Sequence, residues 1–106
     1  MREMSPTELK AYLDTASPAP QLVDVREPAE YQICHIAGAR LIPLAQVPQH
    51  LNDLDPDQEI VVICHHGMRS QRAGEFLERN GFTHIINLVG GIDAWAREVD
   101  TKMPTY

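Results

Sequence analysis

Cysteine and long apolar runs are both scarce in this sequence. The chain has two cysteines, Cys34 and Cys64, which are too few for the disulfide frameworks that stabilise small secreted domains. No segment approaches the roughly 18 apolar residues that cross a membrane. The N-terminus lacks the apolar stretch of a secretory signal, because charge enters within its first three residues. We therefore expect a protein of a reducing compartment, the cytoplasm, with no membrane partner.

Basic residues are also in the minority. Nine lysines and arginines stand against 15 aspartates and glutamates, and the formal net charge of -6 repels the phosphate backbone of nucleic acids. A length of 106 residues, of which 43% are hydrophobic and 23% charged, fits one globular domain. We expect a single domain spanning residues 1–106 that is monomeric and does not bind nucleic acid.

Short apolar runs alternate with longer segments whose apolar residues recur every three or four positions, which is typical of an α/β domain. The run at 60–63 has no polar alternation, as a central strand of a parallel sheet requires. A capping box at Ser5–Glu8 predicts the start of a helix. Gly81 can adopt the left-handed backbone conformation that commonly ends a helix. Strands are predicted at 22–25, 39–42, 60–63 and 85–88, and helical segments from residue 6 and at 27–31, 44–51, 70–80 and 92–98, with a polar linker at 52–58.

This alternation implies right-handed crossovers and a parallel sheet with helices on both faces. Sites in such folds lie at the carboxyl ends of the strands, and Cys64 occupies that position after the central strand. A strand-to-helix loop points backbone N–H groups inward, and the following helix adds its positive end, so both favour a thiolate. Gly67 permits a tight loop, and residues 64–72 carry two arginines and two histidines with no acid. We predict a nucleophilic cysteine and an anionic substrate.

The loop residues also have plainer interpretations. Cys64 is alternatively an inert buried thiol, which the adjacent glycine and arginines disfavour. Arg69 is expected to anchor the loop or to contact an anionic donor, and Ser70 to cap the next helix. His65 and His66 either add positive charge as the pH falls toward about 6.5 or face solvent. We expect no metal ion at Cys64, His65 and His66, because adjacent residues do not readily converge on one tetrahedral ion.

Four motifs can be compared with known families: Asp24-Val25-Arg26-Glu27; His35-Ile36-Ala37-Gly38-Ala39 with Ile42-Pro43-Leu44; the loop 64–70; and Gly90-Gly91-Ile92-Asp93-Ala94-Trp95. Together they resemble the rhodanese-like family, in particular its single-domain thiosulfate sulfurtransferases. The resemblance covers nearly the whole chain. It implies a five-stranded parallel sheet flanked by helices on both faces, with a short strand at 2–4 that the periodicity does not show.

The resemblance also implies an activity. Cys64 would take a sulfane sulfur from thiosulfate or a similar small anionic donor, become a persulfide, and pass the sulfur to cyanide or to a thiol, including a protein thiol, without a cofactor. The alternative from another class is a rhodanese-like interaction or regulatory module with little turnover, which the intact loop disfavours. The predicted site has Cys64 as the catalytic residue and a substrate-binding loop of His65, His66, Gly67, Met68, Arg69 and Ser70.

Loop length bears on a third hypothesis. Related cysteine phosphatases use C-x5-R to encircle a phosphate, whereas Cys64 to Arg69 is C-x4-R. The smaller loop favours a persulfide over a phosphoryl group, and therefore sulfur transfer over phosphatase or arsenate reductase activity.

Several residues outside the loop are interpreted as structural supports of the site or of the fold. Asp24 and Arg26 are expected to brace the loop through charge-assisted hydrogen bonds, whereas Glu27 and Glu30 are interpreted as surface ion-pairing residues. Trp95 is assigned to the core rather than to a substrate platform.

The sequence departs from the usual family pattern at two positions. Cys34 stands where glycine is common, and Ala37 where proline is common, which affects only local turn rigidity. A disulfide between Cys34 and Cys64 would need Cα atoms within about 7 Å. We interpret Cys34 as a simple buried or half-exposed thiol.

Overall fold

Five short parallel strands form one sheet through the centre of the molecule, in the computed structural model that describes residues 1–106. Their order is β1-β5-β4-β2-β3, and every pairing is parallel. The strand at 60–63 is central and fully buried, as its unbroken apolar run predicts. The strands are β1 (Arg2–Met4), β2 (Gln21–Asp24), β3 (Arg40–Leu41), β4 (Ile60–Ile63) and β5 (Ile85–Leu88).

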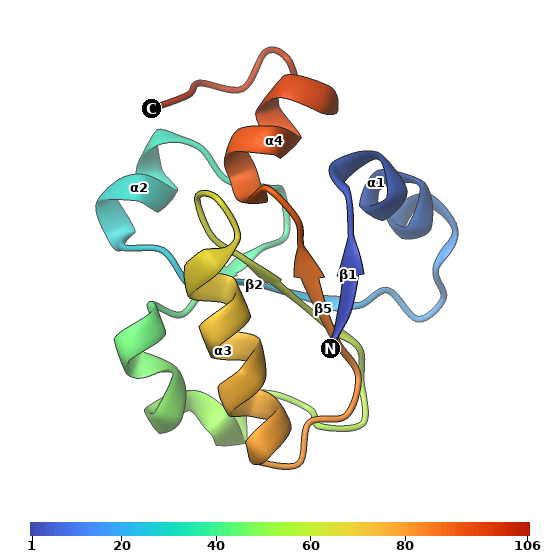
Figure 1. Ribbon diagram of the computed structural model, residues 1–106, viewed down its shortest axis with the longest axis vertical. Helices are drawn as coiled ribbons and strands as arrows, with labels where there is room; N and C mark the ends of the chain where they lie inside the picture. Colours follow the sequence, from blue (N-terminus) through green and yellow to red (C-terminus); the bar gives the residue numbers. More distant parts are fainter.

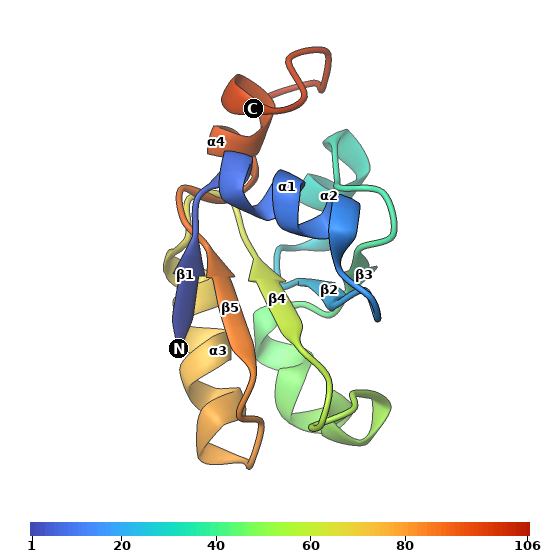
Figure 2. The ribbon, with the colours of Figure 1, turned by 90° about the vertical axis from the view of Figure 1, so that its right-hand side faces the viewer.

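Helices cover both faces of the sheet (Figures 1 and 2), which confirms the predicted architecture. The 3-10 helix and α3 pack on one face, over a core that includes Val62 and Leu77. The other face carries α1 and α4, over a core that includes Leu9, Ile63 and Trp95, so Trp95 belongs to the core as predicted. The helical elements are α1 (Pro6–Thr15), α2 (Pro28–Ile33), η1 (Leu44–Asp53), α3 (Met68–Arg79) and α4 (Gly91–Glu98).

Several boundaries differ from the sequence-based expectations. The 3-10 helix η1 continues to Asp53 and so enters the predicted polar linker. Helix α3 begins at Met68 rather than at residue 70, because Gly67 takes a left-handed φ of 106° and becomes its N-cap. The helix therefore starts directly beside the cysteine loop. Figure 2 shows this end of the molecule, where β4 and β5 point toward α4.

A buried ion pair lies where β2 ends. The side chains of Asp24 and Arg26 are fully buried, with Nη2 2.7 Å from Oδ2, and Nε also donates to this carboxylate at 2.9 Å. The remaining guanidinium hydrogens reach the backbone oxygens of Cys34 and Glu30 and the hydroxyl of Tyr106. Neither side chain hydrogen-bonds the cysteine loop, so the expected direct brace is wrong. The pair instead fixes the segment that carries α2.

The helices have a further common property. None of them combines the length and the hydropathy that crossing a lipid bilayer requires.

Replacing Asp24 by Asn tests how much the buried ion pair contributes to the stability of the fold. The substitution leaves the Arg26 charge buried without its carboxylate, and breaking such a pair costs about 3–5 kcal/mol of folding free energy. Urea denaturation of Asp24→Asn should show that loss. Lys10→Gln is the matched control, because the Lys10–Asp14 pair is about half exposed on both sides and such pairs contribute about 0.5 kcal/mol. Equal losses in the two variants would contradict this interpretation.

Candidate active site

The cysteine loop begins where β4 ends. Cys64 is 1% exposed, and its sulfur accepts a hydrogen bond of 2.9 Å from the backbone N–H of Gly67. That N–H points inward because Gly67 has a positive φ of 106°, which glycine adopts at little cost. The cradle thus has one backbone donor to the sulfur and the N-terminus of α3 beside it, in place of the broader ring of N–H groups that we expected.

The carbonyl groups of the loop are bound from outside by α4. The N–H of Ile92 donates to the oxygen of Cys64 at 2.8 Å, and that of Asp93 donates to the oxygen of His65 at 3.1 Å. This approach requires glycine at position 91, where a Cβ would lie 2.4 Å from each of the two oxygens. The Gly-Gly turn therefore brings the first amides of α4 against the back of the cysteine loop.

Ser70 lies inside the site rather than at a helix cap. Gly67 is the N-cap of α3, which corrects the capping role predicted for Ser70. The Ser70 hydroxyl is 3.3 Å from the Cys64 sulfur and donates to Oδ1 of Asn87 at 2.6 Å. The amide of Asn87 in turn donates to the oxygen of Gly67 at 3.2 Å. Asn87 thus orients a hydroxyl next to the sulfur and binds a carbonyl group of the loop.

Asn87 was missed by the sequence-based reasoning. It is 3% exposed and stands on β5 between two isoleucines and a leucine. A polar residue inside an apolar strand that is covered on both faces needs a hydrogen-bonding partner, and this was the available signal.

Arg69 is bound to Glu30 of α2. Its two terminal nitrogens lie 2.6 and 2.9 Å from the two carboxylate oxygens, which is the bidentate geometry of strong charge-assisted pairs. The hydrogen bond from Arg69 lowers the pKa of Glu30 to about 2. The interpretation of Glu30 as an ion-pairing residue is correct. Its side chain is only 21% exposed, however, and its partner Arg69 belongs to the cysteine loop. Of the two roles considered for Arg69, the structure shows the anchor.

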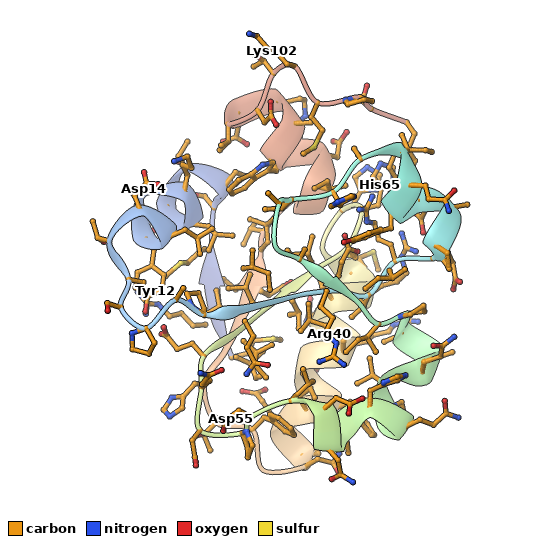
Figure 3. The ribbon with its side chains drawn as sticks, turned by 180° about the vertical axis from the view of Figure 1, so that it is seen from behind. Tyr12, Asp14, Arg40, Asp55, His65 and Lys102 are labelled. Atoms are coloured by element: carbon orange, nitrogen blue, oxygen red, sulfur yellow. The ribbon has the colours of Figure 1, made fainter.

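The two histidines of the loop lie side by side on its outer surface. Their ring centroids are 3.9 Å apart with a tilt of 32°, and the His65 ring stacks on Tyr106 with centroids 4.0 Å apart. Burial, followed by the neighbouring His66, lowers the pKa of His65, so the predicted gain of charge is opposed at this residue. His66 is largely exposed. In Figure 3, His65 lies toward the same end of the molecule as Lys102 and far from Asp55.

The other predicted residues are less central. Met68 is 70% exposed at the first turn of α3. Cys34 is buried and free, as interpreted from the sequence. It lines a shallow crevice together with His65, Asp93 and Tyr106.

Comparison with known proteins identifies the family to which this chain belongs. Residues 5–98 match the rhodanese-like domain. The chain belongs to the rhodanese-like family. The thiosulfate sulfurtransferase GlpE of Pseudoalteromonas translucida is 33% identical over 82 residues, which are 77% of this chain and 78% of GlpE. A solved rhodanese-like domain protein from Staphylococcus aureus is 35% identical, with a TM-score of 0.85, and the match covers 93% of this chain and 95% of that protein.

Other relatives contain the rhodanese-like domain as a part. The adenylyltransferase and sulfurtransferase uba4 of Ogataea parapolymorpha is 37% identical over 94 residues, which are 87% of this chain and 24% of uba4. This chain spans between 26% and 65% of the length of several further curated relatives.

The ion pair between Glu30 and Arg69 predicts a pH-dependent part of the stability. A carboxylate whose pKa is about 2 in the folded protein and about 4.3 in the unfolded chain stabilises the folded state fully above pH 4.3. That contribution falls as the pH drops from about 4.3 to 2. Glu30→Gln should therefore be less stable than the parent at neutral pH, by about 1 kcal/mol, and the difference should shrink over this acidic window.

Urea denaturation at several pH values between 2 and 7 measures the difference. Glu75→Gln is the control, because Glu75 is exposed on α3 and makes no ion pair. A difference between Glu30→Gln and the parent that stays constant down to pH 2 would rule out this role of the pair.

Asn87 should be energetically coupled to Ser70. Asn87→Leu leaves the hydroxyl of Ser70 without its acceptor and removes a donor from the oxygen of Gly67, and buried groups that lose their partners cost about 1–3 kcal/mol. A double-mutant cycle with Ser70→Ala in urea denaturation should give a non-additive sum, because the two substitutions remove one shared hydrogen bond. Additive losses would show that the bond between Ser70 and Asn87 contributes nothing.

Proposed function

We propose that this protein is a sulfurtransferase that carries a sulfane sulfur on Cys64. The observation that carries the proposal is the hydrogen bond of 2.9 Å from the N–H of Gly67 to the Cys64 sulfur, at the N-terminus of α3. A backbone donor and the positive end of a helix stabilise an anionic sulfur, whether it is a thiolate or a persulfide. Membership of the rhodanese-like family supports the same chemistry.

In the first half-reaction the Cys64 thiolate attacks the outer sulfur of thiosulfate. A bond forms between the cysteine sulfur and the sulfane sulfur, and the sulfur–sulfur bond of thiosulfate breaks. The electron pair of that bond leaves with sulfite, and the sulfur that remains on the enzyme carries one negative charge. Charge is conserved, because a thiolate and a dianion give a persulfide anion and a sulfite dianion.

In the second half-reaction a nucleophile attacks the outer sulfur of the persulfide. Cyanide gives thiocyanate, and a thiolate gives a new persulfide; in both cases the bond to Cys64 breaks and the thiolate returns. Two half-reactions through a covalent intermediate predict ping-pong kinetics. The N–H of Gly67 faces the sulfur in the described state and needs no reorganisation to stabilise charge there.

Burial imposes a condition on this mechanism. Cys64 is 1% exposed, so a donor reaches the sulfur only when the side chains that cover it move aside. The outer residues His66 and Met68 are largely exposed and therefore have room to move.

The phosphatase hypothesis is the weaker one for a reason beyond loop length. A phosphoryl dianion needs cationic donors around its oxygens, whereas both terminal nitrogens of Arg69 are bound to Glu30. The compact C-x4-R loop and this occupied arginine both favour a covalent intermediate that is a single sulfur atom, which has no oxygens to bind, over one that is a phosphoryl group.

The proposal includes partners and location. We propose that the donor is a small sulfur anion and that the acceptor is cyanide or a thiol, including a protein thiol. The fusion of a similar domain into an adenylyltransferase and sulfurtransferase supports a protein acceptor. A monomer in the cytoplasm, where thiols stay reduced, agrees with two free cysteines.

Intact mass spectrometry tests the persulfide. Protein incubated with thiosulfate should gain one sulfur atom, about 32 Da, which dithiothreitol removes. Cys64→Ser should not gain it. Cys34→Ser is the matched control and should gain it as the parent does, because Cys34 takes no part in the proposed transfer.

Absence of the added mass in the parent protein would contradict the sulfurtransferase and favour an interaction module. A stable mass gain in Cys64→Ser would place the chemistry on the other cysteine. Release of phosphate from an aryl phosphate, with no sulfur adduct, would favour the phosphatase hypothesis.

A further inference from the structure

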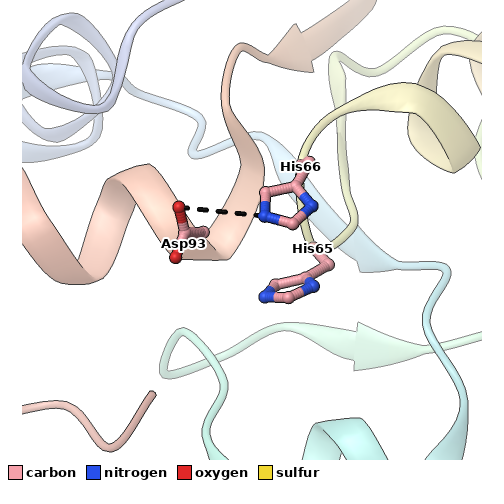
Figure 4. A group of neighbouring side chains, drawn as sticks. All are labelled: His65, His66 and Asp93. Atoms are coloured by element: carbon pink, nitrogen blue, oxygen red, sulfur yellow. Dashed lines mark ion pairs between the residues drawn. The ribbon is translucent and has the colours of Figure 1, made fainter. Parts of the chain in front are cut away.

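Three metal-ligating side chains meet on the outside of the cysteine loop. His65 and His66 come from the loop itself, and Asp93 comes from the first turn of α4. One nitrogen of each histidine and one carboxylate oxygen lie within 4.8 Å of one another. Figure 4 shows His66 directed toward Asp93, with His65 beside it.

The histidines reach one side of the loop although they are adjacent in sequence. The loop turns between β4 and α3, and the two rings lie 3.9 Å apart with a tilt of only 32°. The objection that adjacent residues do not converge on one ion therefore does not hold for this pair.

The spacing is close to that of a zinc site. Ligand atoms bonded at about 2.0–2.1 Å to a tetrahedral ion stand about 3.3 Å from one another. The three ligand atoms of this cluster lie within 4.8 Å of one another. Side-chain rotations that move each atom by about 1 Å would bring them to the separation found in a zinc site. Nε2 of His66 is already 3.9 Å from Oδ2 of Asp93, and neither side chain is buried.

The surroundings hold two of the ligands in place. The His65 ring stacks on Tyr106 with centroids 4.0 Å apart, and an outer contact of this kind limits the rotation of a histidine ligand. The N–H of Asp93 donates to the oxygen of His65, so the carboxylate and the imidazole are tied through the backbone. One competitor is present, because Arg97 lies 3.3 Å from Oδ2 of Asp93.

We propose that His65, His66 and Asp93 bind one divalent transition-metal ion of the zinc class on the outer surface of the cysteine loop, in a ligand set that excludes Cys64. Two imidazoles and one carboxylate suit Zn²⁺, and three protein ligands leave a further coordination position open. The proposal does not depend on sulfur transfer.

Zn²⁺ binding to the full chain, stripped of metal with a chelator and kept reduced, tests the site by isothermal titration calorimetry. We expect one ion per chain. His66→Gln and Asp93→Asn should each weaken binding by at least about tenfold, because each removes a ligand. Arg97→Gln should strengthen binding about twofold, because it removes the cation that competes for Asp93.

Two control variants separate this site from others. His50→Gln alters a second histidine–aspartate contact, in which Nδ1 lies 2.8 Å from the Asp53 carboxylate, and should leave Zn²⁺ affinity unchanged. Cys64→Ser should also bind with unchanged affinity. With Co²⁺ as a spectroscopic probe, the parent protein should show d–d bands and no thiolate charge-transfer band.

Three results would overturn the proposal. They are the absence of saturable Zn²⁺ binding at up to about 1 mM, a loss in His50→Gln equal to that in His66→Gln, and a loss of binding in Cys64→Ser together with a thiolate band. Circular dichroism of each variant checks that the substitution has not changed the fold. His66 and Asp93 point to the surface, so their substitution should leave the fold intact.

Discussion

The cysteine loop can turn an N–H group toward a sulfur only if its carbonyl oxygens are bound elsewhere. Two of these oxygens, on Cys64 and His65, accept hydrogen bonds from the first amides of α4, and that of Gly67 accepts one from Asn87 on β5. Without these donors the carbonyl dipoles would be free to turn toward the sulfur and would destabilise negative charge there. The geometry around Cys64 therefore depends on β5 lying next to β4, with α4 following it.

This dependence explains why the sequence located Cys64 and its loop but missed the residues that support the loop. An apolar run of four residues followed by a cysteine and a glycine is a local signal, and it placed Cys64 correctly at the end of the central strand. Asn87 and Glu30 act on the loop from 23 and 34 residues away in the sequence. Their roles follow from strand order and from the position of α2, which periodicity does not report.

The strand β1 is another feature that the periodicity of the sequence does not predict. Three residues, Arg2–Met4, are too few for an alternation of apolar and polar residues to be recognised. The strand exists because its backbone groups pair with β5, from Arg2 opposite Ile86 to Met4 opposite Leu88. Only the resemblance to a family with a fifth strand predicted it.

A count of charges along the loop also leaves out the acidic residues that the fold brings to it. Residues 64–72 contain no acid, yet the folded loop has Glu30 on Arg69 and Asp93 near His66. A segment that is basic in sequence is thus partly neutralised in space. In the proposed mechanism, the stabilisation of an anionic sulfur then depends on the N–H of Gly67 and on the N-terminus of α3, which are backbone features that residue counts do not measure.

The hydroxyl of Ser70 shows how the site distinguishes a thiol from an anion. A hydroxyl has one hydrogen, and here Ser70 donates it to Asn87, whose own amide is committed to Gly67. The Ser70 oxygen therefore faces the sulfur as an acceptor, which suits a protonated Cys64. Once the sulfur loses its proton, the hydroxyl must turn its hydrogen from Asn87 to the sulfur to stabilise the charge, and the bond given up at Asn87 offsets part of that gain. The N–H of Gly67, which donates to the sulfur without rearrangement, is consequently the main fixed support of the anion.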